Sequence, residues 1–319
     1  MGEAEIIARL RRSATHPAAR GLLDDVALLD GLVITHDSIA EGVHFLPSDP
    51  PASVGWKLMA VNLSDLAAKG ATPAAALLSL TLTGDSDWES KFLDGIDAAA
   101  ETYAIPLIGG DTISLPQGAP RVLGLTAIGR AGARTPERSG ARPGDRLWVV
   151  GTLGDSAAGL AMLQADARAI GALVDIYRRP VPQLAAGQAL APYANASMDV
   201  SDGLLLDTSR MAEASRCGVR IDLGQLPLSA AFVAERGVAL EARMFAATGG
   251  DDYALLAALA PEVDPFTLSL PSGTTIARVG TFVEGNAALA LTHGGIEVPL
   301  PESLGYEHRN LASPMADRS

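Results

Sequence analysis

Aspartates recur in one sequence context along this chain of 319 residues. Five segments place an aspartate after an apolar or small-residue run and beside glycine, serine, threonine or another aspartate: "GLLDDVALL", "LVITHDSIAEG", "LIGGDTIS", "ASMDVSDGL" and "ATGGDDYALL". A single aspartate of this kind is an ordinary turn residue, because Asp and Gly are favoured where a strand leaves the core. The repeated pattern, together with Asp65 in "AVNLSDLAAKGATP", indicates carboxylates that converge on one cleft.

Carboxylates gathered in one cleft require cations. Two of them about 4 Å apart repel by on the order of 1 kcal/mol in water and 4 kcal/mol at the effective dielectric of a protein surface. Oxygen ligands with few histidines and no cysteine nearby select hard cations, Mg²⁺ before Zn²⁺. Because Mg²⁺ is usually held by one or two carboxylates plus waters and phosphates, many acids indicate several ions. The pattern therefore predicts aspartates that hold Mg²⁺ and Mg²⁺ that holds nucleotide phosphates.

Other chemistries find little support in the motifs. The sequence contains no GxxxxGK[ST] or GxGxxG phosphate loop, no GxSxG elbow and no HExxH pair, which disfavours a nucleophilic serine or a zinc-bound water. The segment "GTLGDSAAG", which follows a strand predicted over 146–150, could present backbone N–H groups to an anion at a helix N-terminus. It is equally compatible with an ordinary turn and helix cap.

The helix predicted over Ser53–Lys69 carries Asn62, Asp65 and Lys69 on roughly one face. Two interpretations stay open at this point. The face could be solvated, with Asp65 and Lys69 paired at i,i+4 for about a few tenths of a kcal/mol. Alternatively, the face could look into the cleft to which the other aspartates belong.

Strands and helices must position these acids, and the apolar patterns alternate between the two. Strand-like runs at 32–39, 75–83, 105–111 and 121–131 alternate with helical patterns over Ser53–Lys69 and Trp88–Tyr103. The alternation resumes after Arg134–Asp145, "RTPERSGARPGD", a segment rich in Pro, Gly and Arg. A chain of this length favours two domains, which we place at residues 1–135 and 143–319. The pattern predicts an α/β or α+β architecture in both.

Composition disfavours several kinds of partner. A net charge of −13 without a Lys/Arg run argues against nucleic acid and anionic membranes. No apolar run approaches the roughly 18 residues of a membrane span, and "MGEAEIIARLRRS" lacks the pattern of a signal peptide. The single cysteine, Cys217, excludes a disulfide framework and predicts a packed side chain. We expect a cytoplasmic protein, with a disordered polar segment "SPMADRS".

The order of the motifs adds a resemblance that covers about Leu22 to Tyr306. The segments that carry it are "DDVALL", "HDSIAEGVHFL", "GWKLMAVNLSDLAAKGATP", "GGDT", "RSGARPGD", "GTLGDSAAGLAML", "RPVPQLAAGQAL", "MDVSDGLLLD" and "GGDDYALL". In this order they resemble the thiamine-monophosphate kinase family of the aminoimidazole ribonucleotide synthetase superfamily. The segments "AVNLSDLAAKGATP" and "DVSDGL" are typical of the superfamily, whereas "EGVHF" and the terminal "GYEH" favour the thiamine-phosphate branch.

The resemblance implies ATP-dependent phosphorylation of thiamine monophosphate to thiamine diphosphate, with several Mg²⁺ ions. The implied fold is α/β (α+β), with an N-terminal mixed sheet that pairs with its twin in a homodimer and a C-terminal α+β domain that closes over the nucleotide and substrate cleft. Because a phosphate nucleophile is already anionic at neutral pH, no dedicated catalytic side chain is expected beyond a metal cluster of Asp37, Asp65 and Asp111.

The resemblance also implies roles for individual residues. The implied metal ligands are Asp25, Thr35, Asp37, Asp65, Asp111, Asp199 and Asp202, with His36 contributing through its backbone carbonyl. The implied ATP contacts are Tyr103, Gly110, Asp111, Arg138 and Ser201. The implied substrate contacts are His44, Asp251 and Tyr306. On sequence grounds alone, Arg138 could equally be a linker arginine and His44 a packed loop histidine.

Three departures from the family pattern bear on these roles. Leu23 stands where glycine usually precedes the two acids, and His36 stands where threonine is common. Asp251 replaces a glutamate and is one methylene shorter, so that its substrate contact could become water-mediated.

Other functions stay open beside the kinase activity. Within the same superfamily they are synthesis of aminoimidazole ribonucleotide or formylglycinamidine ribonucleotide, and selenophosphate synthesis, which the position of Cys217 disfavours. Outside enzyme chemistry, the chain could be a non-catalytic nucleotide-binding module.

Overall fold

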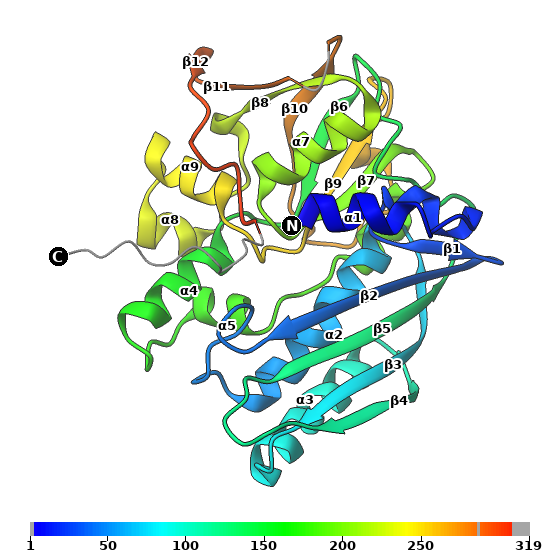
Figure 1. Cartoon of the computed structure of the whole chain (residues 1–319). Helices are drawn as coiled ribbons and strands as arrows, with labels where there is room; N and C mark the ends of the chain where they lie inside the picture. The colour runs from blue at the N-terminus through cyan, green and yellow to red at the C-terminus, as the bar shows by residue number, and fades with distance from the viewer. Residues whose placement is uncertain (1–2, 286–287, 308–319) are drawn as a thin grey trace.

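A computed structural model describes residues 3–285 and 288–307, which form two β-sheets with helices around and between them (Figure 1). The segment "SPMADRS", expected to be disordered, lies outside the described residues. None of the described helices combines the length and the hydropathy needed to span a bilayer.

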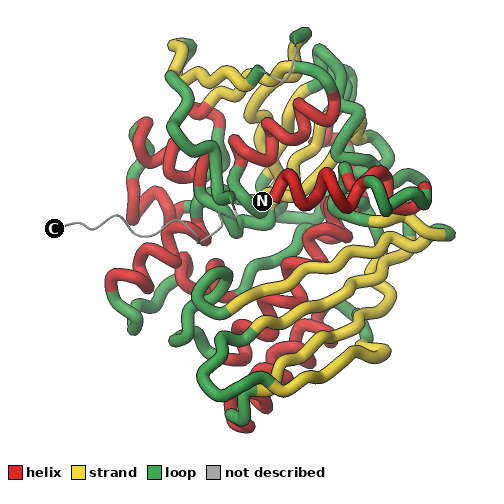
Figure 2. Tube along the Cα trace, viewed as in Figure 1, coloured by secondary structure: helices red, strands yellow, loops and turns green. Residues whose placement is uncertain are grey.

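The N-terminal sheet has the strand order β1-β2-β5-β3-β4. Its strands are β1 (Ala27–Leu29), β2 (Leu32–Ala40), β3 (Thr72–Leu82), β4 (Leu107–Ser114) and β5 (Val122–Arg130). β3 and β4 are parallel and the other pairs are antiparallel, which confirms the expected mixed sheet. α2 (Pro51–Ala68) and α3 (Ser86–Thr102) cover one face, whereas Figure 2 shows no described helix over the other face. We call that second side the open face.

The C-terminal sheet has the strand order β12-β11-β8-β10-β6-β9-β7. Its strands are β6 (Arg146–Val150), β7 (Ala194–Val200), β8 (Gly218–Asp222), β9 (Ala254–Leu259), β10 (Ile276–Val283), β11 (Leu289–His293) and β12 (Ile296–Val298). The helices of this half are α4 (Asp155–Ala165), α5 (Ala172–Arg178), α6 (Leu184–Leu190), α7 (Leu204–Ser215), α8 (Ala230–Arg236) and α9 (Leu240–Thr248). The remaining elements are α1 (Glu3–Arg11) and the short helices η1 (Pro17–Leu22), η2 (Leu223–Gln225) and η3 (Pro265–Thr267).

The connection between the two sheets, residues 131–145, contains neither helix nor strand. This is the segment in which we expect the two domains to meet, and the limits 1–135 and 143–319 stay a prediction. Apolar side chains form a core beside each sheet. A third cluster joins the two halves, because Ala67 and Ala68 at the end of α2 pack with Trp148 and Leu255 of the C-terminal sheet.

α2 lies between the two halves and positions most of the acids described below. It contacts β2 and β5 on one side and α6, β7 and β9 on the other. The helix predicted over Ser53–Lys69 is thus confirmed to within two residues at either end. Its close packing on α3 depends on two glycines: a Cβ on Gly55 would lie 2.2 Å from the carbonyl oxygen of Phe92, and one on Gly95 would lie 2.0 Å from that of Ala52.

Candidate active site

Asp65 lies on the face of α2 that is turned toward β2 and is only 6% exposed. The Thr35 hydroxyl on β2 donates to its carboxylate at 2.5 Å. Two residues along the strand, the backbone N–H of Asp37 donates to the Asn62 side chain at 2.9 Å. Burial, followed by the neighbouring carboxylates of Asp37 and Asp199, raises the pKa of Asp65 well above its usual value. The polar face of α2 is therefore buried in a cluster of acids.

Lys69 does not form the i,i+4 pair with Asp65 that the solvated interpretation required. Its ammonium is fully buried and lies 2.6 Å from Asp24 and 3.5 Å from Asp25, and it donates to the carbonyl of Ser197 at 2.8 Å. The interpretation of this face as a solvated stripe is wrong, because the folded chain turns Lys69 inward toward the two consecutive acids before β1.

Asp25 is held by cations of the protein itself. Arg138, from the connection between the sheets, forms a short hydrogen bond with its carboxylate. Burial opposes ionisation of Asp25, but Arg138 and Lys69 outweigh that effect and lower its pKa. Arg138, expected at the nucleotide phosphates, is thus engaged with an expected metal ligand. One oxygen of Asp25, Oδ2, is buried and accepts no hydrogen bond.

The C-terminal half contributes the end of β7 to the same cluster. Asp199 is 4% exposed and accepts from the hydroxyl of Ser64, the α2 residue next to Asp65, at 2.6 Å. Burial and then the charge of Asp25 raise the pKa of Asp199 to about 8. Desolvation by the surrounding protein, followed by the charges of Asp25 and Asp202, raises the pKa of Asp37 to about 6, although this residue lies at the exposed edge of the cluster. The structure therefore brings Thr35, Asp37, Asp65 and Asp199 together from three elements of both halves.

The loop after β7 is ordered by Asp207, a residue that the sequence pattern did not single out. Its carboxylate accepts the backbone N–H groups of Ser201 at 3.1 Å, Asp202 at 3.0 Å and Gly203 at 3.2 Å. Arg210 bonds to the side chains of both Asp202 and Asp207. The expected phosphate contact Ser201 and the expected metal ligand Asp202 therefore lie on a loop of fixed conformation.

His36, Gly110 and Asp111 lie apart from this cluster. Asp111 on β4 is level with Ser79 on β3, and both side chains are exposed on the open face. The His36 ring lies on that face as well, 2.9 Å from the Thr126 hydroxyl. Because side chains alternate along a strand, His36 points away from the acids that its neighbours Thr35 and Asp37 approach.

Strand order separates Asp111 from the acid cluster further. Two strands, β5 and β3, lie between β2 and β4, so Asp37 and Asp111 are about 14 Å apart across the sheet at the usual strand spacing. Gly110 is tied to β3, where a Cβ would lie 1.9 Å from the carbonyl oxygen of Leu78. Within a single chain, the cluster expected from Asp37, Asp65 and Asp111 does not form, because Asp111 occupies the far edge strand and the opposite face.

The three expected substrate contacts come from three loops. His44 follows β2, and its Nδ1 accepts the backbone N–H of Ala40 at 3.1 Å. Asp251, before β9, accepts from the ammonium of Lys57 at 2.7 Å. The backbone N–H of Tyr306 donates to the carbonyl of Asp202 at 2.9 Å, which brings this residue beside the loop after β7. The sequence patterns did not identify Lys57 as a site residue, although a lysine within the apolar run "GWKLMAV" indicates a buried cation with a specific partner.

Tyr103, expected near adenine, directly follows α3 and packs against Trp56 with ring centroids 5.5 Å apart. It belongs to the apolar core on the helix-covered side of the sheet. Burial raises its pKa to about 12. The described chain therefore does not bring Tyr103 to Gly110 and Asp111, the other nucleotide contacts expected on this sheet.

The segment "GTLGDSAAG" does not offer a vacant anion site. The Asp252 carboxylate already accepts the backbone N–H of Gly154 at 2.7 Å and of Ser156 at 3.4 Å at the start of α4. An acid of the chain itself takes the position in which the sequence allowed a bound anion. The alternative interpretation, a turn and helix cap, describes this segment.

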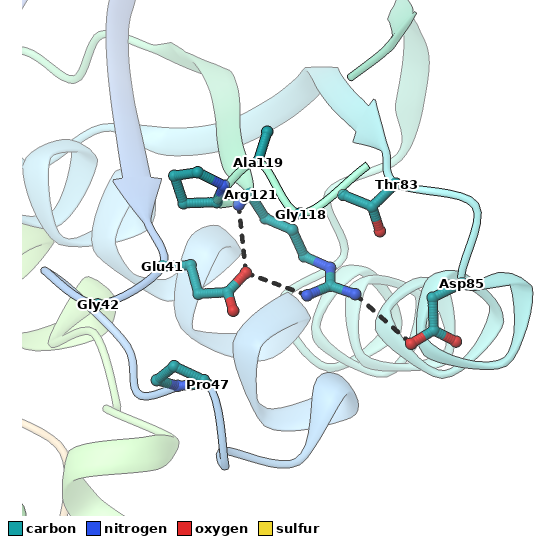
Figure 3. A pocket seen from close by; sticks show the side chains of 9 residues that line it. Glu41, Gly42, Pro47, Thr83, Asp85, Gly118, Ala119 and Arg121 are labelled. Atoms are coloured by element: carbon teal, nitrogen blue, oxygen red, sulfur yellow. Dashed lines mark hydrogen bonds and ion pairs between the residues drawn. The ribbon is translucent and has the colours of Figure 1, made fainter. Parts of the chain in front are cut away.

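A separate pocket of about 420 Å³ opens where β2 and β3 end and β5 begins (Figure 3). At its centre the Arg121 guanidinium lies 3.0 Å from Glu41 and 3.5 Å from Asp85, over the Trp88 ring. None of the expected site residues lines it. The acid cluster is thus distinct from this pocket.

The donor set of the acid cluster fits a hard cation. In the described part of the chain, no three Asp, Glu, His or Cys side chains form a ready-made metal site. Desolvation, followed by neighbouring carboxylates, raises the pKa values of Asp37, Asp65 and Asp199, so a bound cation would favour their ionised forms. Oδ2 of Asp25, which accepts no hydrogen bond and has only the Lys69 ammonium at 3.5 Å, is a further ligand atom for a cation. Oxygen donors of this kind suit Mg²⁺, which would offset their repulsion.

The two sheets and the acids shared between them define a protein class. A family model described as AIR synthase related protein, N-terminal domain, matches residues 23–131, and one described as AIR synthase related protein, C-terminal domain, matches residues 142–289. The fold expected from the sequence, a two-domain α/β (α+β) architecture, is thereby confirmed.

Comparison with named relatives identifies the family within the AIR synthase related class. The chain is 40% identical to the thiamine-monophosphate kinase of Escherichia coli O157:H7, over 96% of this chain and 98% of that one. It is also 40% identical to the thiamine-monophosphate kinase of Caulobacter vibrioides, over 96% and 90% of the two chains. A solved structure of AaThiL complexed with AMPPCP and TMP is 32% identical and superposes with a TM-score of 0.84 over 97% of each chain. The chain therefore belongs to the thiamine-monophosphate kinase family.

Proposed function

We propose that this protein transfers the γ-phosphoryl group of ATP to thiamine monophosphate. A phosphate oxygen of the acceptor forms the new P–O bond, the bond between the γ-phosphorus and the β–γ bridging oxygen breaks, and ADP leaves with the electron pair. The observation that carries the proposal is the buried meeting of Asp65 and Asp199, carboxylates from opposite halves whose repulsion calls for cations. The AaThiL structure, with its ATP analogue and TMP, supports the same substrates here.

The residues of the chain act by binding and orientation. No side chain has to remove a proton, because the attacking phosphate oxygen is ionised at neutral pH. Asp25, Asp37, Asp65 and Asp199, with Thr35 and Asp202, would hold the Mg²⁺ ions, which neutralise the charge of the phosphates. Arg138 would bind a phosphate if it exchanged Asp25 for the nucleotide. His44, Asp251 and Tyr306 would hold the acceptor beside the loop after β7, to which Asp251 and Tyr306 are hydrogen-bonded.

The test supplies the purified protein with ATP, Mg²⁺ and thiamine monophosphate and measures thiamine diphosphate by chromatography. Equal amounts of ADP and thiamine diphosphate are expected. A panel of other phosphoryl acceptors, aminoimidazole-pathway precursors included, should give no comparable product. Absence of thiamine diphosphate at every Mg²⁺ concentration would overturn the proposal, whereas ATP binding without turnover of any acceptor would favour a non-catalytic nucleotide-binding module.

A homodimer is part of the proposal, because Asp111 lies too far from the acid cluster of its own chain to contribute to it. Leu77, Ile113 and Val122 are exposed on the open face beside Asp111. A second copy that covers this face would bury them, and it would place Asp111 of one chain near the acids of the other. Two inactive variants, Asp65→Asn and Asp111→Asn, should then regain about a quarter of the wild-type rate when mixed and allowed to exchange, since half of the dimers would contain one intact site. A monomer in light scattering, or no recovery, would contradict this arrangement.

The reducing cytoplasm is the compartment we propose for the reaction. The only cysteine, Cys217, is 1% exposed and unpaired, as is usual for a small packed side chain in such a compartment.

A further inference from the structure

Lys57, within α2, is buried like Lys69, which directly follows that helix, and it contacts His44 and Asp251, two of the expected acceptor contacts. Its side chain is 2% exposed, and its ammonium donates to Oδ2 of Asp251 at 2.7 Å and to the carbonyl of His44 at 2.9 Å. It also lies 4.2 Å from the ring centre of Tyr177 in α5. One cation thus joins two of the loops that carry expected acceptor contacts.

Asp251 is held from a second direction as well. The Tyr253 hydroxyl donates to Oδ1 of Asp251 at 2.9 Å, so that each carboxylate oxygen has a partner from the protein. Asp251 and Tyr253 have φ angles of +65° and +50°, a region that side chains other than glycine rarely adopt. Backbone hydrogen bonds from Asp251 to the Ser201 carbonyl and from Tyr253 to the Val200 carbonyl keep this turn against the end of β7. Such strained turns persist where the surroundings determine them strongly.

We infer that Lys57 and Tyr253 are positioning residues that hold Asp251 as a fixed carboxylate for acceptor recognition. This inference rests on the proposed function. An ionised carboxylate offers about four lone-pair directions, so Asp251 can still accept an N–H group of a cationic, amino-bearing heterocycle while both restraints stay in place. Lys57 also sets the separation of Asp251 from His44, because it binds both.

Lys57 does not reach the acceptor itself, because its ammonium is enclosed by Asp251, His44 and Tyr177. If Lys57 only joined the two halves, its removal would lower the stability of the protein and change the KM values for ATP and the acceptor alike. If Lys57 positions Asp251, its removal should change the KM for the acceptor alone. Asp251 and His44 are the expected acceptor contacts, whereas the acids of the metal cluster have other partners.

The experiment compares Lys57→Met, Lys57→Arg, Tyr253→Phe and Asp251→Asn with a control, Lys91→Met, whose ammonium is exposed on α3 and pairs with Asp87 of the same helix. We expect Lys57→Met to raise the KM for thiamine monophosphate about tenfold or more, and Tyr253→Phe to raise it severalfold, while the KM for ATP stays within about twofold. Lys57→Arg should recover part of the loss, and the control should match the wild type. Calorimetry should show the same weakening of thiamine monophosphate binding without ATP.

A double variant distinguishes action through Asp251 from independent effects. In the Asp251→Asn background, Lys57→Met should change the KM for the acceptor little further, because the group that Lys57 positions is already altered. Equal changes in both KM values, or full additivity in the double variant, would overturn the inference. Tyr253→Phe keeps the test decisive if Lys57→Met does not fold. A wild-type protein without kinase activity would instead refute the proposed function, and binding calorimetry with thiamine monophosphate would still decide whether Asp251 is positioned for it.

Discussion

At the scale of single residues, the acids of this site differ by their partners. Asp24 and Asp25 are matched with Lys69, Arg20 and Arg138. Asp65 and Asp199 have hydroxyl partners instead, Thr35 and Ser64, which do not neutralise their charge. The second group therefore carries the stronger demand for metal ions.

Asp65→Asn should separate catalysis from folding. The neutral amide keeps the shape of the carboxylate and can still accept from Thr35, so we expect the fold to persist. Because burial and repulsion raise the pKa of Asp65, removal of its charge should leave the thermal midpoint of the metal-free protein equal or higher. The turnover number should fall by about a hundredfold or more, as expected when a group that stabilises transition-state charge is lost. Circular dichroism, thermal scans and steady-state rates check this, and a near-native rate would remove Asp65 from the metal site.

Lys69→Met should destabilise the protein strongly. The substitution keeps the length of the side chain but leaves Asp24 and Asp25 with less positive charge in a buried site. Loss of one partner from a buried ion pair costs about 3 kcal/mol or more in the free energy of unfolding. Urea denaturation measures the change, and Lys91→Met is the matched control because the exposed Lys91–Asp87 pair should add nothing measurable. Equal stability of the two variants would show that Lys69 is not an essential counter-ion.

At the scale of elements, α2 determines the geometry of the site. It is apolar enough to be buried between two halves. Its polar residues Asn62, Ser64 and Asp65, with Lys69 directly after the helix, reach β2, β7 and the acids before β1. A helix of this kind is found from sequence by its length and apolar content, and its limits were predicted closely. What the polar residues contact was not predictable, because partners such as Asp24 and Asp199 are distant in sequence.

The same difficulty explains Asp111 and Asp252. The strand that carries Asp111 is clear from "IPLIGGDTIS", but the face it presents and its place at the far edge depend on the order of strands in the sheet. Asp252 belongs to the recognised motif "GGDDYALL", yet its contact with the start of α4 spans 98 residues of sequence. The sequence therefore predicts which residues are chemically important more reliably than it predicts which of them meet.

Gly55→Ala should test the packing of α2 on α3. The new methyl group would lie 2.2 Å from a backbone oxygen of α3, which cannot move without displacing the helix. We expect a loss of about 2 to 3 kcal/mol in the free energy of unfolding. Gly132→Ala serves as the control, because the nearest atom to its Cβ is 3.5 Å away. Similar midpoints in urea for the two variants would contradict close packing at Gly55.

At the scale of the whole molecule, the two halves are joined by packing and by charge. Ala67 and Ala68 share an apolar cluster with the C-terminal sheet, and Lys69 binds the carbonyl of Ser197 on β7. Closure of the C-terminal domain over a nucleotide, which the family resemblance implies, must therefore leave the end of α2 in place. The global stability of the protein should accordingly respond to the charge of the shared acid cluster.

The metal-free protein should lose stability as the pH rises. Unfolded aspartates titrate near pH 4, whereas the folded pKa values of Asp37 and Asp199 are about 6 and about 8. Between these limits the folded protein binds more protons than the unfolded chain, so the free energy of unfolding decreases from about pH 4 to about pH 8. Mg²⁺ should stabilise the protein most at the upper end of this range. Thermal midpoints with a chelator and with Mg²⁺ measure both effects.

Asp199→Asn is the control for that dependence, since it removes a carboxyl whose pKa in the folded protein is raised to about 8. Its metal-free midpoint should fall less steeply above about pH 6. An unchanged slope in this variant, together with no added effect of Mg²⁺ at high pH, would show that the cluster does not govern the stability of the protein.

The carboxylate of Asp252 at the start of α4 has an evolutionary consequence. It accepts backbone N–H groups at a helix N-terminus, where many other proteins bind a phosphate group. Loss of this one side chain in a duplicated gene would uncover the amide donors of Gly154 and Ser156 in the same C-terminal half that carries Asp199 and Asp251. Descendants of this enzyme could thus acquire a second phosphate ligand by losing a residue rather than by inventing a pocket.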